Sequence, residues 1–526
     1  MSRESRILVW ALRAWALILI TLSLAAPLLP EENAWGLWPA TYLPAGWRWA
    51  LALLAAGLAL FGDRIPTGWL TARANIPFPV TLSPRHRVTV SPCHPVTLSP
   101  HALRLVLALA ALLPFYLFRL QHLRWGDAYI LIHAIPHPQA QLTYTWQAPL
   151  DLFLHAKAWA LGHRLFGWPD PTPVYWFISA LAGGVFVWVL LGLAGWLGRD
   201  RAERAVIGGL VLSLGTMQLF FGYIENYSLM TVGVLIYIFL ALRAQRGEVA
   251  LIWPATALAL THAFHPSTII LSPSLLYLAW MTFSRQFKPS AVPGFEALAG
   301  LVGDSRNRLT LAPAHTDRCS AGEPPNRSDA RSPSPLRRGI RTILQLAIPY
   351  LLVFAGLVAL MTAGGHGLDA LLGADAPGGG DRNWFVPLFQ TSTRWEHYTM
   401  FSRGHLLDIL NEQLLVAPAI WPGFVLAALF AGRRLPWRDG AFRLLLSMAL
   451  LYLLLTLTWN PDYGGQRDWD LFAPAALPAA LLCGLTLTHA LPERPALRAA
   501  AWALIAAQAF HTILWIYQNT LPWMPT

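Results

Sequence analysis

An aspartate stands within a short aromatic segment of the sequence, Arg124-Trp-Gly-Asp127-Ala-Tyr129. A carboxylate of this kind can act as a general base that deprotonates or orients a hydroxyl acceptor, as nucleophilic substitution at a sugar carbon requires. The same residues are typical of an interfacial loop, in which Trp and Tyr anchor at the level of lipid head groups and Asp caps a helix. On these six residues alone, the interfacial loop is the better interpretation.

A glutamate lies in a second polar segment, Tyr223-Ile-Glu225-Asn-Tyr227, between two apolar stretches that have almost no loop between them. An unpaired carboxylate at the edge of the hydrocarbon costs about 2–3 kcal/mol, so Glu225 should face protein or a wet cavity. It could hydrogen-bond a sugar hydroxyl while Tyr227 stacks on the ring, or it could belong to a solvated helical turn. The sequence favours neither interpretation.

Two histidines, His262 and His265, are spaced one helical turn apart before Pro266. Such a pair can share a metal ion, but no acidic or cysteine ligand lies beside it in the sequence. A hydrogen bond to a phosphate or a sugar is the better functional hypothesis, and a simple interfacial cap is the plainest interpretation. No cofactor is firmly implied; a divalent metal would be compatible with the chain but is not indicated.

The most polar segment comes late in the chain, where Arg467, Asp468 and Asp470 follow Gly464-Gly465 within a run of eleven residues. An arginine can hold a phosphate by paired hydrogen bonds. An Arg–Asp pair that satisfies itself is the alternative. The segment gains functional weight if it lies on the same face as Asp127.

The composition shows what must position these residues. Only 12% of the 526 residues are charged and 55% are hydrophobic, and a soluble domain carries about twice that charged fraction. Apolar stretches recur that approach or reach the roughly 20 residues needed to cross a bilayer, and in lipid such segments must be helical. The sequence therefore predicts an all-α, polytopic transmembrane bundle. It contains no motif for nucleotide phosphates, dinucleotides, a zinc-protease helix or a serine nucleophile.

We expect thirteen spans, of which the second and seventh are short, and regard twelve to fourteen as compatible with the pattern. Their approximate ranges are 7–29, 47–62, 102–118, 174–197, 205–222, 228–242, 249–262, 267–283, 343–363, 414–431, 442–458, 472–490 and 498–517.

Charge sets the expected orientation. With the N-terminus inside, 28 of the 38 basic residues fall in cytoplasmic loops, and a loop bias of this kind directs insertion. This pattern, rather than nucleic-acid binding, explains the positive net charge. We expect a multi-pass protein of the plasma (inner) membrane with its N-terminus cytoplasmic and its C-terminus external, and with the polar segments on the external face.

The chain divides into four expected regions. Residues 1–101 hold two helices and a proline- and serine-rich cytoplasmic loop, and residues 102–290 hold a membrane core with a first large external loop at 119–173. Residues 291–342 form a basic cytoplasmic loop whose composition cannot build a packed core. Residues 343–526 hold the C-terminal helices, with external loops at 364–413 and 459–472.

The region 102–290 resembles the GT-C superfamily of polytopic membrane glycosyltransferases. Gly126-Asp127 matches the acidic motif at the start of the first external loop, and Pro149-Leu150 matches the entry to a juxtamembrane helix. Many relatives carry two adjacent acids, whereas Ala128 follows Asp127 here, and two spans precede the one that usually comes first. The resemblance implies a GT-C-like bundle.

The resemblance also implies a sugar donor linked to polyprenyl phosphate and an acceptor that is a glycan, a lipid or a protein. Asp127 would be the base, and Arg124 or Arg467 would neutralise the departing lipid phosphate. Glu225 and the aromatic residues would shape the sugar pocket, with Asp468, Asp470 and the two histidines as further substrate contacts. The alternative is a transporter or flippase for a lipid-linked sugar or another envelope precursor, which would need ionisable groups at mid-membrane.

Overall fold

The computed structural model describes residues 1–65, 99–137, 147–286, 335–365 and 384–522. Within these ranges the regular structure is helical, apart from one isolated bridge between Phe385 and Trp459, so the predicted all-α class is confirmed. The helices are α1 (Arg3–Ala25), α2 (Glu31–Ala34), α3 (Ala45–Phe61), α5 (Pro100–Leu117), α6 (Ala128–Ala134), α7 (Pro149–Phe166), α8 (Thr172–Leu197), α9 (Arg201–Leu212), α10 (Ser228–Gln245), α11 (Ile252–Phe264), α12 (Ser272–Gln286), α14 (Pro335–Ala363), α16 (Arg403–Val416), α17 (Ile420–Ala431), α18 (Gly440–Thr458), α19 (Trp469–Phe472), α20 (Ala476–Ala490) and α21 (Arg494–Asn519).

Ten helices in the described ranges are long and apolar enough to cross a membrane, or eleven if one bent pair counts as a span. The chain is therefore a multi-pass membrane protein, but the count differs from the thirteen expected. The helices α9, α11 and α17 stand where three spans were predicted, and they have 12, 13 and 12 residues. At 1.5 Å per residue each covers about 18–20 Å, which is less than the roughly 30 Å of a hydrocarbon core.

Proline accounts for two of the three short helices, because it disfavours the helical conformation of the residue before it. Pro266 follows α11, and His265 is extended with ψ 128°. Pro418 lies between α16 and α17, which are bent by 92° relative to one another. The third, α9, gives way to a tighter 3-10 segment at Gly215–Phe220. The predicted ranges placed the break at Pro266, between residues 262 and 267, but ran through the other two breaks.

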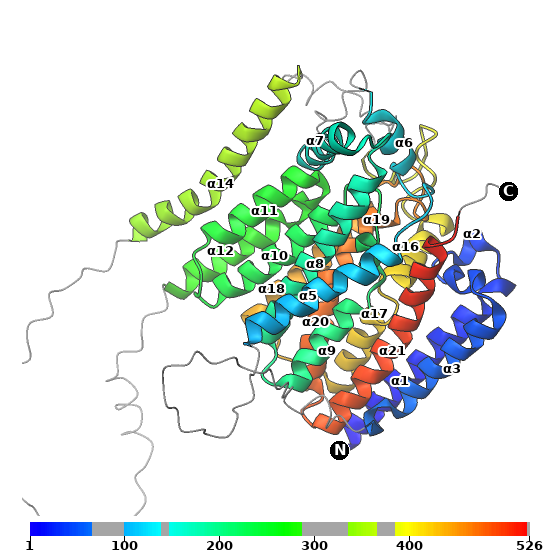
Figure 1. The fold of residues 1–526 in the computed structure, drawn as a ribbon. Coiled ribbons are helices and arrows are strands. Elements are labelled where there is room, and N and C mark those ends of the chain that lie inside the picture. The colour runs from blue at the N-terminus through cyan, green and yellow to red at the C-terminus, as the bar shows by residue number, and fades with distance from the viewer. Residues whose placement is uncertain (66–98, 138–146, 287–334, 366–383, 523–526) are drawn as a thin grey trace, which may run out of the picture.

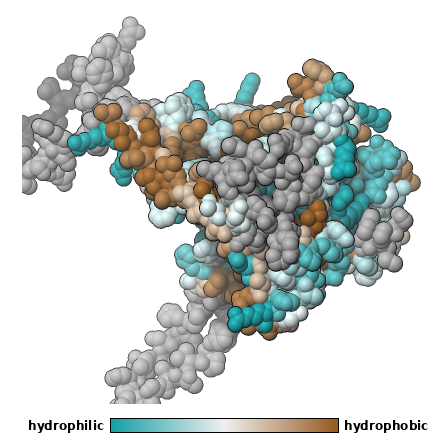
Figure 2. Space-filling view, turned by 90° about the horizontal axis from the view of Figure 1, so that it is seen from above, coloured by the Kyte–Doolittle hydropathy of each residue, from teal (hydrophilic) through white to brown (hydrophobic). Residues whose placement is uncertain are grey.

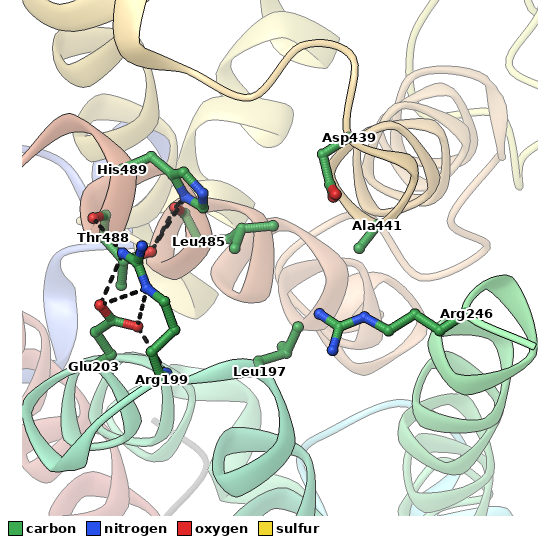
Figure 3. Close-up of a pocket in the computed structure, with 9 residues that line it drawn as sticks. All are labelled: Leu197, Arg199, Glu203, Arg246, Asp439, Ala441, Leu485, Thr488 and His489. Carbon is green, nitrogen blue, oxygen red and sulfur yellow. Dashed lines mark hydrogen bonds and ion pairs between the residues drawn. The ribbon is translucent and has the colours of Figure 1, made fainter. Parts of the chain in front are cut away.

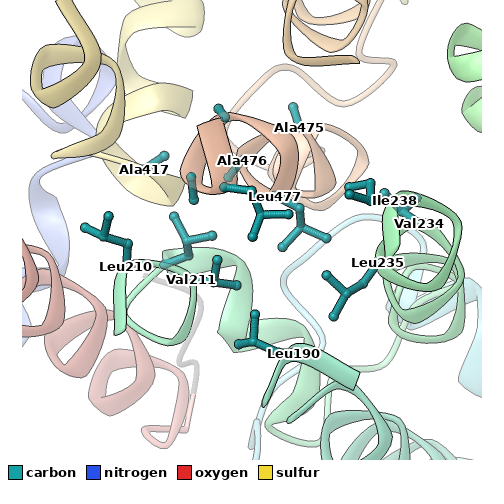
Figure 4. Close-up of a cluster of buried hydrophobic side chains, with 14 of the residues drawn as sticks. Leu190, Leu210, Val211, Val234, Leu235, Ile238, Ala417, Ala475, Ala476 and Leu477 are labelled. Atoms are coloured by element: carbon teal, nitrogen blue, oxygen red, sulfur yellow. The ribbon is translucent and has the colours of Figure 1, made fainter. Parts of the chain in front are cut away.

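The centre of the bundle is built around α20, and every residue of the segment Trp469–Ala490, which contains α19 and α20, is buried except His489. Leu477 of this helix lies among Leu190 of α8, Val211 of α9 and Leu235 of α10 (Figure 4). Many of the residues of α20 are Ala or other small side chains, which let helix backbones approach closely in a membrane. This close packing fixes the positions of α8, α9, α10 and α20 relative to one another.

One helix stands off from the others. Only 6% of the apolar, potentially membrane-spanning part of α14 is buried. It contacts mainly α11 and projects beside the bundle in Figure 1. In the view from above it forms part of a hydrophobic arm (Figure 2). Its exposed Leu351, Leu352 and Phe354 are therefore suited to contact with lipid.

The bundle has two chemically different ends. At one end the start of α1 meets the end of α17 and the start of α21. Ser2 donates its backbone N–H to Glu493, just before α21, at 3.0 Å, and Glu4 forms an ion pair with Arg434, just after α17, at 2.6 Å. The other end carries α6, α7 and α16 together with the C-terminal end of α21 (Figure 1). The 26 residues of α21 connect the two ends. Which end faces the cytoplasm stays a prediction from the loop charges.

The expected low-complexity segments lie almost entirely outside the described residues. These are the proline–serine repeat within residues 79–100 and most of the basic loop 291–342. Much of the external loop 364–413 also lies outside. The described part of that loop, from Trp384 onward, pairs with the 459–472 segment through the bridge at Trp459.

Candidate functional site

Asp127 sits in a tight turn that a glycine makes possible. Gly126 has φ +45°, a left-handed conformation that favours glycine, and its N–H donates to the Arg467 carbonyl at 3.0 Å. A Cβ atom built on Gly126 would lie 2.5 Å from Oε1 of Glu225 and 3.3 Å from Oδ2 of Asp470. The turn therefore packs directly against two carboxylates that come from distant parts of the sequence.

The C-terminal end of α21 holds the Gly126–Asp127 turn in place. Nε1 of Trp125 donates to Oδ1 of Asn519 at 2.7 Å, and His122 contacts the same oxygen at 3.1 Å. The ring of Trp125 packs 5.1 Å from that of Trp515. Trp125 is 1% exposed, so this contact anchors the segment before Asp127 in the bundle core.

Glu225 supports the same turn from the loop before α10. One of its carboxylate oxygens accepts the backbone N–H of Asp127, and the other accepts that of Asn226 at 3.1 Å. Glu225 is 2% exposed. Burial raises its pKa well above the ordinary value, and the charges of Asp127 and Asp470 raise it further. Glu225 is thus a buried acid that holds the backbone beneath Asp127.

Asp470 completes a group of three acids. Its Oδ2 accepts the hydroxyl of Tyr223 at 2.8 Å, and it is 1% exposed. Tyr223 is itself buried, with its ring packed against Trp469. We call Asp127, Glu225 and Asp470 the acid cluster. The three come from the loops before α6 and α10 and from α19, so only the folded chain brings them together.

Asp127 is the member of the cluster that reaches outward. It is partly exposed, and its Oδ1 accepts the Tyr463 hydroxyl at 2.9 Å. Burial raises its pKa above the ordinary value, while hydrogen bonds from Tyr463 and Gln147 and the charge of Arg467 act in the opposite direction. A carboxylate with a raised pKa and a fixed orientation is suited to accept a proton.

Arg467 lies beside this carboxylate. Its guanidinium stacks over the Tyr463 ring at 4.8 Å, and the side chain is exposed. Within the part of the chain that the structure describes, it forms no ion pair. A guanidinium in this state can bind a phosphate by paired hydrogen bonds.

Asp468 has a structural setting rather than an open one. It accepts the backbone N–H of Tyr463 at 2.7 Å, which closes the 463–468 turn. Burial raises its pKa well above the ordinary value, and the charge of Asp470 contributes to the same shift. The sequence grouped Asp468 with the substrate contacts, whereas the structure shows it shaping the loop that carries Tyr463.

Two residues of the first motif point elsewhere. Arg124 forms an ion pair with Glu31 at 3.1 Å, and Gln466 donates to the same carboxylate oxygen at 2.8 Å. Tyr129 is 61% exposed and packs against His133 at 4.1 Å. The structure therefore does not bring Tyr129 to the acid cluster, and it shows Arg124 already engaged by an acid.

The two histidines are separated by the end of α11. His262 contacts the hydroxyls of Thr268 at 2.7 Å and Tyr350 at 3.3 Å, which links α11 to α14. His265 packs 5.0 Å from the ring of Tyr227, which begins α10. Burial lowers the pKa of His265 to about 4, so this imidazole is neutral near pH 7. His265 and Tyr227 are near one another, and His262 ties helices together.

Sequence reasoning missed several buried ionisable residues at this end. Asp151 and His155 on α7 form a pair at 3.0 Å, with His155 stacked on Tyr175. Their spacing of four residues on a helix is a signal that could have identified the pair. Glu412 of α16, 2% exposed, lines a cavity of about 10 Å³ with Asp408. No spacing in the sequence marks its closeness to the acid cluster.

The described residues contain no group of three or more His, Cys, Asp or Glu side chains arranged to hold a metal ion. The arrangement can perform proton transfer at Asp127 and anion binding at Arg467. Both groups lie at the end of the bundle that carries α6 and α7.

No protein-family model matches the chain, and no curated protein matches it. Among solved structures, the chain is similar to the oligosaccharyltransferase of Archaeoglobus fulgidus tethered to an acceptor peptide with an NVT sequon. The TM-score is 0.40 and the sequence identity is 15%, over 80% of this chain and 55% of that protein. This chain thus spans little more than half the length of the archaeal enzyme.

Proposed function

We propose that the protein is a membrane glycosyltransferase. It moves a sugar from a polyprenyl-phosphate-linked donor to an acceptor hydroxyl or amide at the end of the bundle that carries the acid cluster. The observation that carries this proposal is the meeting of the Gly126–Asp127 turn with Glu225, Asp470 and the 463–468 loop. The GT-C resemblance of residues 102–290 supplies the class of donor.

Proton transfer falls to Asp127. As the acceptor attacks the anomeric carbon, its proton passes to Oδ2 of the carboxylate, since Oδ1 accepts the Tyr463 hydroxyl. A new bond forms between the acceptor and the sugar carbon, and the bond from that carbon to the phosphate oxygen breaks. The electron pair leaves with the polyprenyl phosphate, and inversion at the carbon is the expectation from the family.

Arg467 is the residue that we assign to the leaving phosphate. It is exposed and lies beside Asp127, whereas Arg124 is engaged by Glu31. A guanidinium stabilises the growing negative charge most when it is already positioned, and the contact with the Tyr463 ring provides that positioning. Donor binding at the membrane surface requires no separate nucleotide-binding domain, because the lipid itself presents the sugar.

Glu225 acts as a positioning residue in this proposal. Both of its oxygens are occupied by backbone N–H groups, one of them that of Asp127. It therefore orients the base rather than binding a sugar hydroxyl directly. Tyr227 and His265 form an aromatic and neutral wall beside it, suited to the apolar face of a sugar ring.

The decisive experiment replaces the base. Purified protein in liposomes is given a panel of radiolabelled polyprenyl-phosphate sugars together with glycan, lipid and peptide acceptors, and release of polyprenyl phosphate is measured for wild type and Asp127→Asn. We expect Asp127→Asn to abolish release while the protein still inserts and unfolds at the wild-type temperature. Glu32→Gln, which removes an exposed carboxylate within α2, is the matched control and should stay active.

The same liposomes test the rival function. A transporter or flippase would move the lipid-linked sugar to the opposite leaflet without releasing the polyprenyl phosphate. Full activity of Asp127→Asn, or translocation with no release by wild type, would refute the transferase proposal. In the described residues the acid cluster lies at one end of the bundle, whereas a transporter places such groups near mid-membrane.

A further inference from the structure

A cavity lies at the opposite end of the bundle from Asp127. It has a volume of about 140 Å³ and opens between four helix ends. Its lining includes the last residue of α8, Leu197, and Arg246 just beyond α10, with Asp439 before α18 and His489 near the end of α20 (Figure 3). Drug-sized ligands fill about 300–1,000 Å³, so this space suits a small polar group.

One pair of charges in the lining is already satisfied. Arg199 contacts Glu203 at 2.9 Å and also donates to the Thr488 carbonyl at 3.3 Å. Arg494 contacts the same glutamate at 2.9 Å. These contacts hold the starts of α9 and α21 and the end of α20 together. They leave Arg246 and Asp439 as the charges that a ligand would meet.

Arg246 is fixed in place, and the nearby carboxylate of Glu248 forms its ion pair with Arg243 at 3.0 Å instead. Its guanidinium stacks over the Trp196 ring at 3.9 Å, and Nε1 of Trp196 donates to Glu248 at 2.9 Å. No hydrogen bond or ion pair involves this guanidinium within the described ranges of the chain. In Figure 3 the side chain extends from α10 into the space beside Leu197. Stacking on a ring leaves the N–H groups at the edge of the guanidinium available to an anion.

Asp439 presents the complementary charge. It caps α18, and its Oδ1 accepts the N–H of Phe442 at 3.0 Å. Its other oxygen has no partner in the described structure, and Figure 3 shows the carboxylate directed toward the cavity. Between the two charges, Leu197, Ala441 and Leu485 supply an apolar floor.

We propose that this cavity binds the zwitterionic head group of a phospholipid, with the phosphate on Arg246 and a primary ammonium on Asp439. One free charge of each sign matches a zwitterion better than it matches a purely anionic ligand. The apolar floor suits the glycerol carbons next to the phosphate. Basic pockets between transmembrane helices bind phosphate-containing lipid head groups in other membrane proteins. This site is independent of the transferase proposal.

The test measures lipid retention by native mass spectrometry. The full-length protein is equilibrated in detergent with equal amounts of phosphatidylethanolamine, phosphatidylcholine and phosphatidylglycerol that carry the same acyl chains. We expect wild type to retain phosphatidylethanolamine about tenfold better than the other two, because among the three only this lipid has both a phosphate for Arg246 and a primary ammonium that donates hydrogen bonds to Asp439.

Two substitutions separate the two contacts. Arg246→Gln should lower phosphatidylethanolamine retention about tenfold, and Asp439→Asn should remove its preference over phosphatidylglycerol. Asparagine still caps a helix, so Asp439→Asn keeps α18 intact. Arg201→Gln, at an exposed arginine of the same end that does not line the cavity, is the control and should behave as wild type.

Three outcomes would overturn the proposal. The first is unchanged retention in Arg246→Gln at an unchanged unfolding temperature. The second is equal loss in Arg201→Gln, which would indicate general surface charge. The third is displacement of the lipid by an excess of inorganic phosphate, which would make this a free-phosphate site. Since no sugar transfer is measured, failure here leaves the transferase proposal untouched.

Discussion

The hydroxyl of Tyr463 offers the sharpest test of Asp127 as the base. Tyr463→Phe removes one atom, which donates to Oδ1 of Asp127 at 2.9 Å. The ring remains beneath Arg467, and the backbone N–H of residue 463 still reaches Asp468. The substitution therefore changes the stabilisation of the carboxylate and keeps these two contacts.

The magnitude follows from that hydrogen bond. A hydrogen bond to a charged group contributes about 1.5–3 kcal/mol, and the partial exposure of Asp127 favours the lower end because water can replace the phenol. About 1.4 kcal/mol corresponds to one pKa unit. The bond stabilises the charged form, so its loss raises the pKa of Asp127 by about one unit above a value that burial already raises.

The assay is the pH profile of polyprenyl phosphate release. A base must be deprotonated, so the rate falls as pH drops through its pKa. In Tyr463→Phe the acidic limb should move up by about one pH unit, which lowers the rate about tenfold on that limb and leaves the alkaline plateau unchanged. Tyr129→Phe, at an exposed tyrosine away from the cluster, should leave both limbs in place.

Two results would refute this reasoning. An acidic limb at the wild-type pH in Tyr463→Phe would mean that Asp127 does not control the profile. Loss of the plateau together with a lower unfolding temperature would mean that Tyr463 acts through the fold of the 459–472 loop.

Two further substitutions probe the same end of the bundle. Gly126→Ala places a Cβ atom 2.5 Å from Glu225 at a φ of +45°, where a non-glycine residue costs about 1–2 kcal/mol. We expect sugar transfer to fall at least tenfold and the unfolding temperature to fall as well. The control is Gly167→Ala, which strains the backbone but meets no neighbouring atom, and it should lower stability and keep activity. Asp151→Asn breaks a buried pair, at a cost of about 3 kcal/mol. Burial lowers the pKa of His155, but the charge of Asp151 raises it, and the net shift is upward. The stabilisation from the Asp151–His155 pair is therefore complete below the unfolded pKa near 6.5 and is lost as pH rises through the folded value. Thermal unfolding should show that loss in wild type and not in Asp151→Asn, and identical pH dependence in the two proteins would contradict it.

Much of the architecture follows from composition, because a membrane leaves the backbone few choices. Long apolar stretches must form helices, and the structure has helices at all thirteen predicted positions. The short α11 was predicted, but the lengths of α9 and α17 were not, since the breaks after Leu212 and at Pro418 depend on local backbone conformation within otherwise apolar runs. The sequence also identified all three members of the acid cluster, each as a polar residue at the edge of an apolar stretch.

Residue types and their order along the chain identify an all-α membrane protein with polar segments between its helices, and they single out Asp127, Glu225 and Asp470. The packed structure was needed to show that these three carboxylates meet around Gly126, that Tyr463 rather than Tyr129 contacts Asp127, and that Arg124 forms an ion pair with Glu31. These contacts join residues that are far apart along the chain. Hydropathy is a local property, whereas the contacts from Gly126 to residues 225, 467 and 470 depend on how the packed helices present their loops.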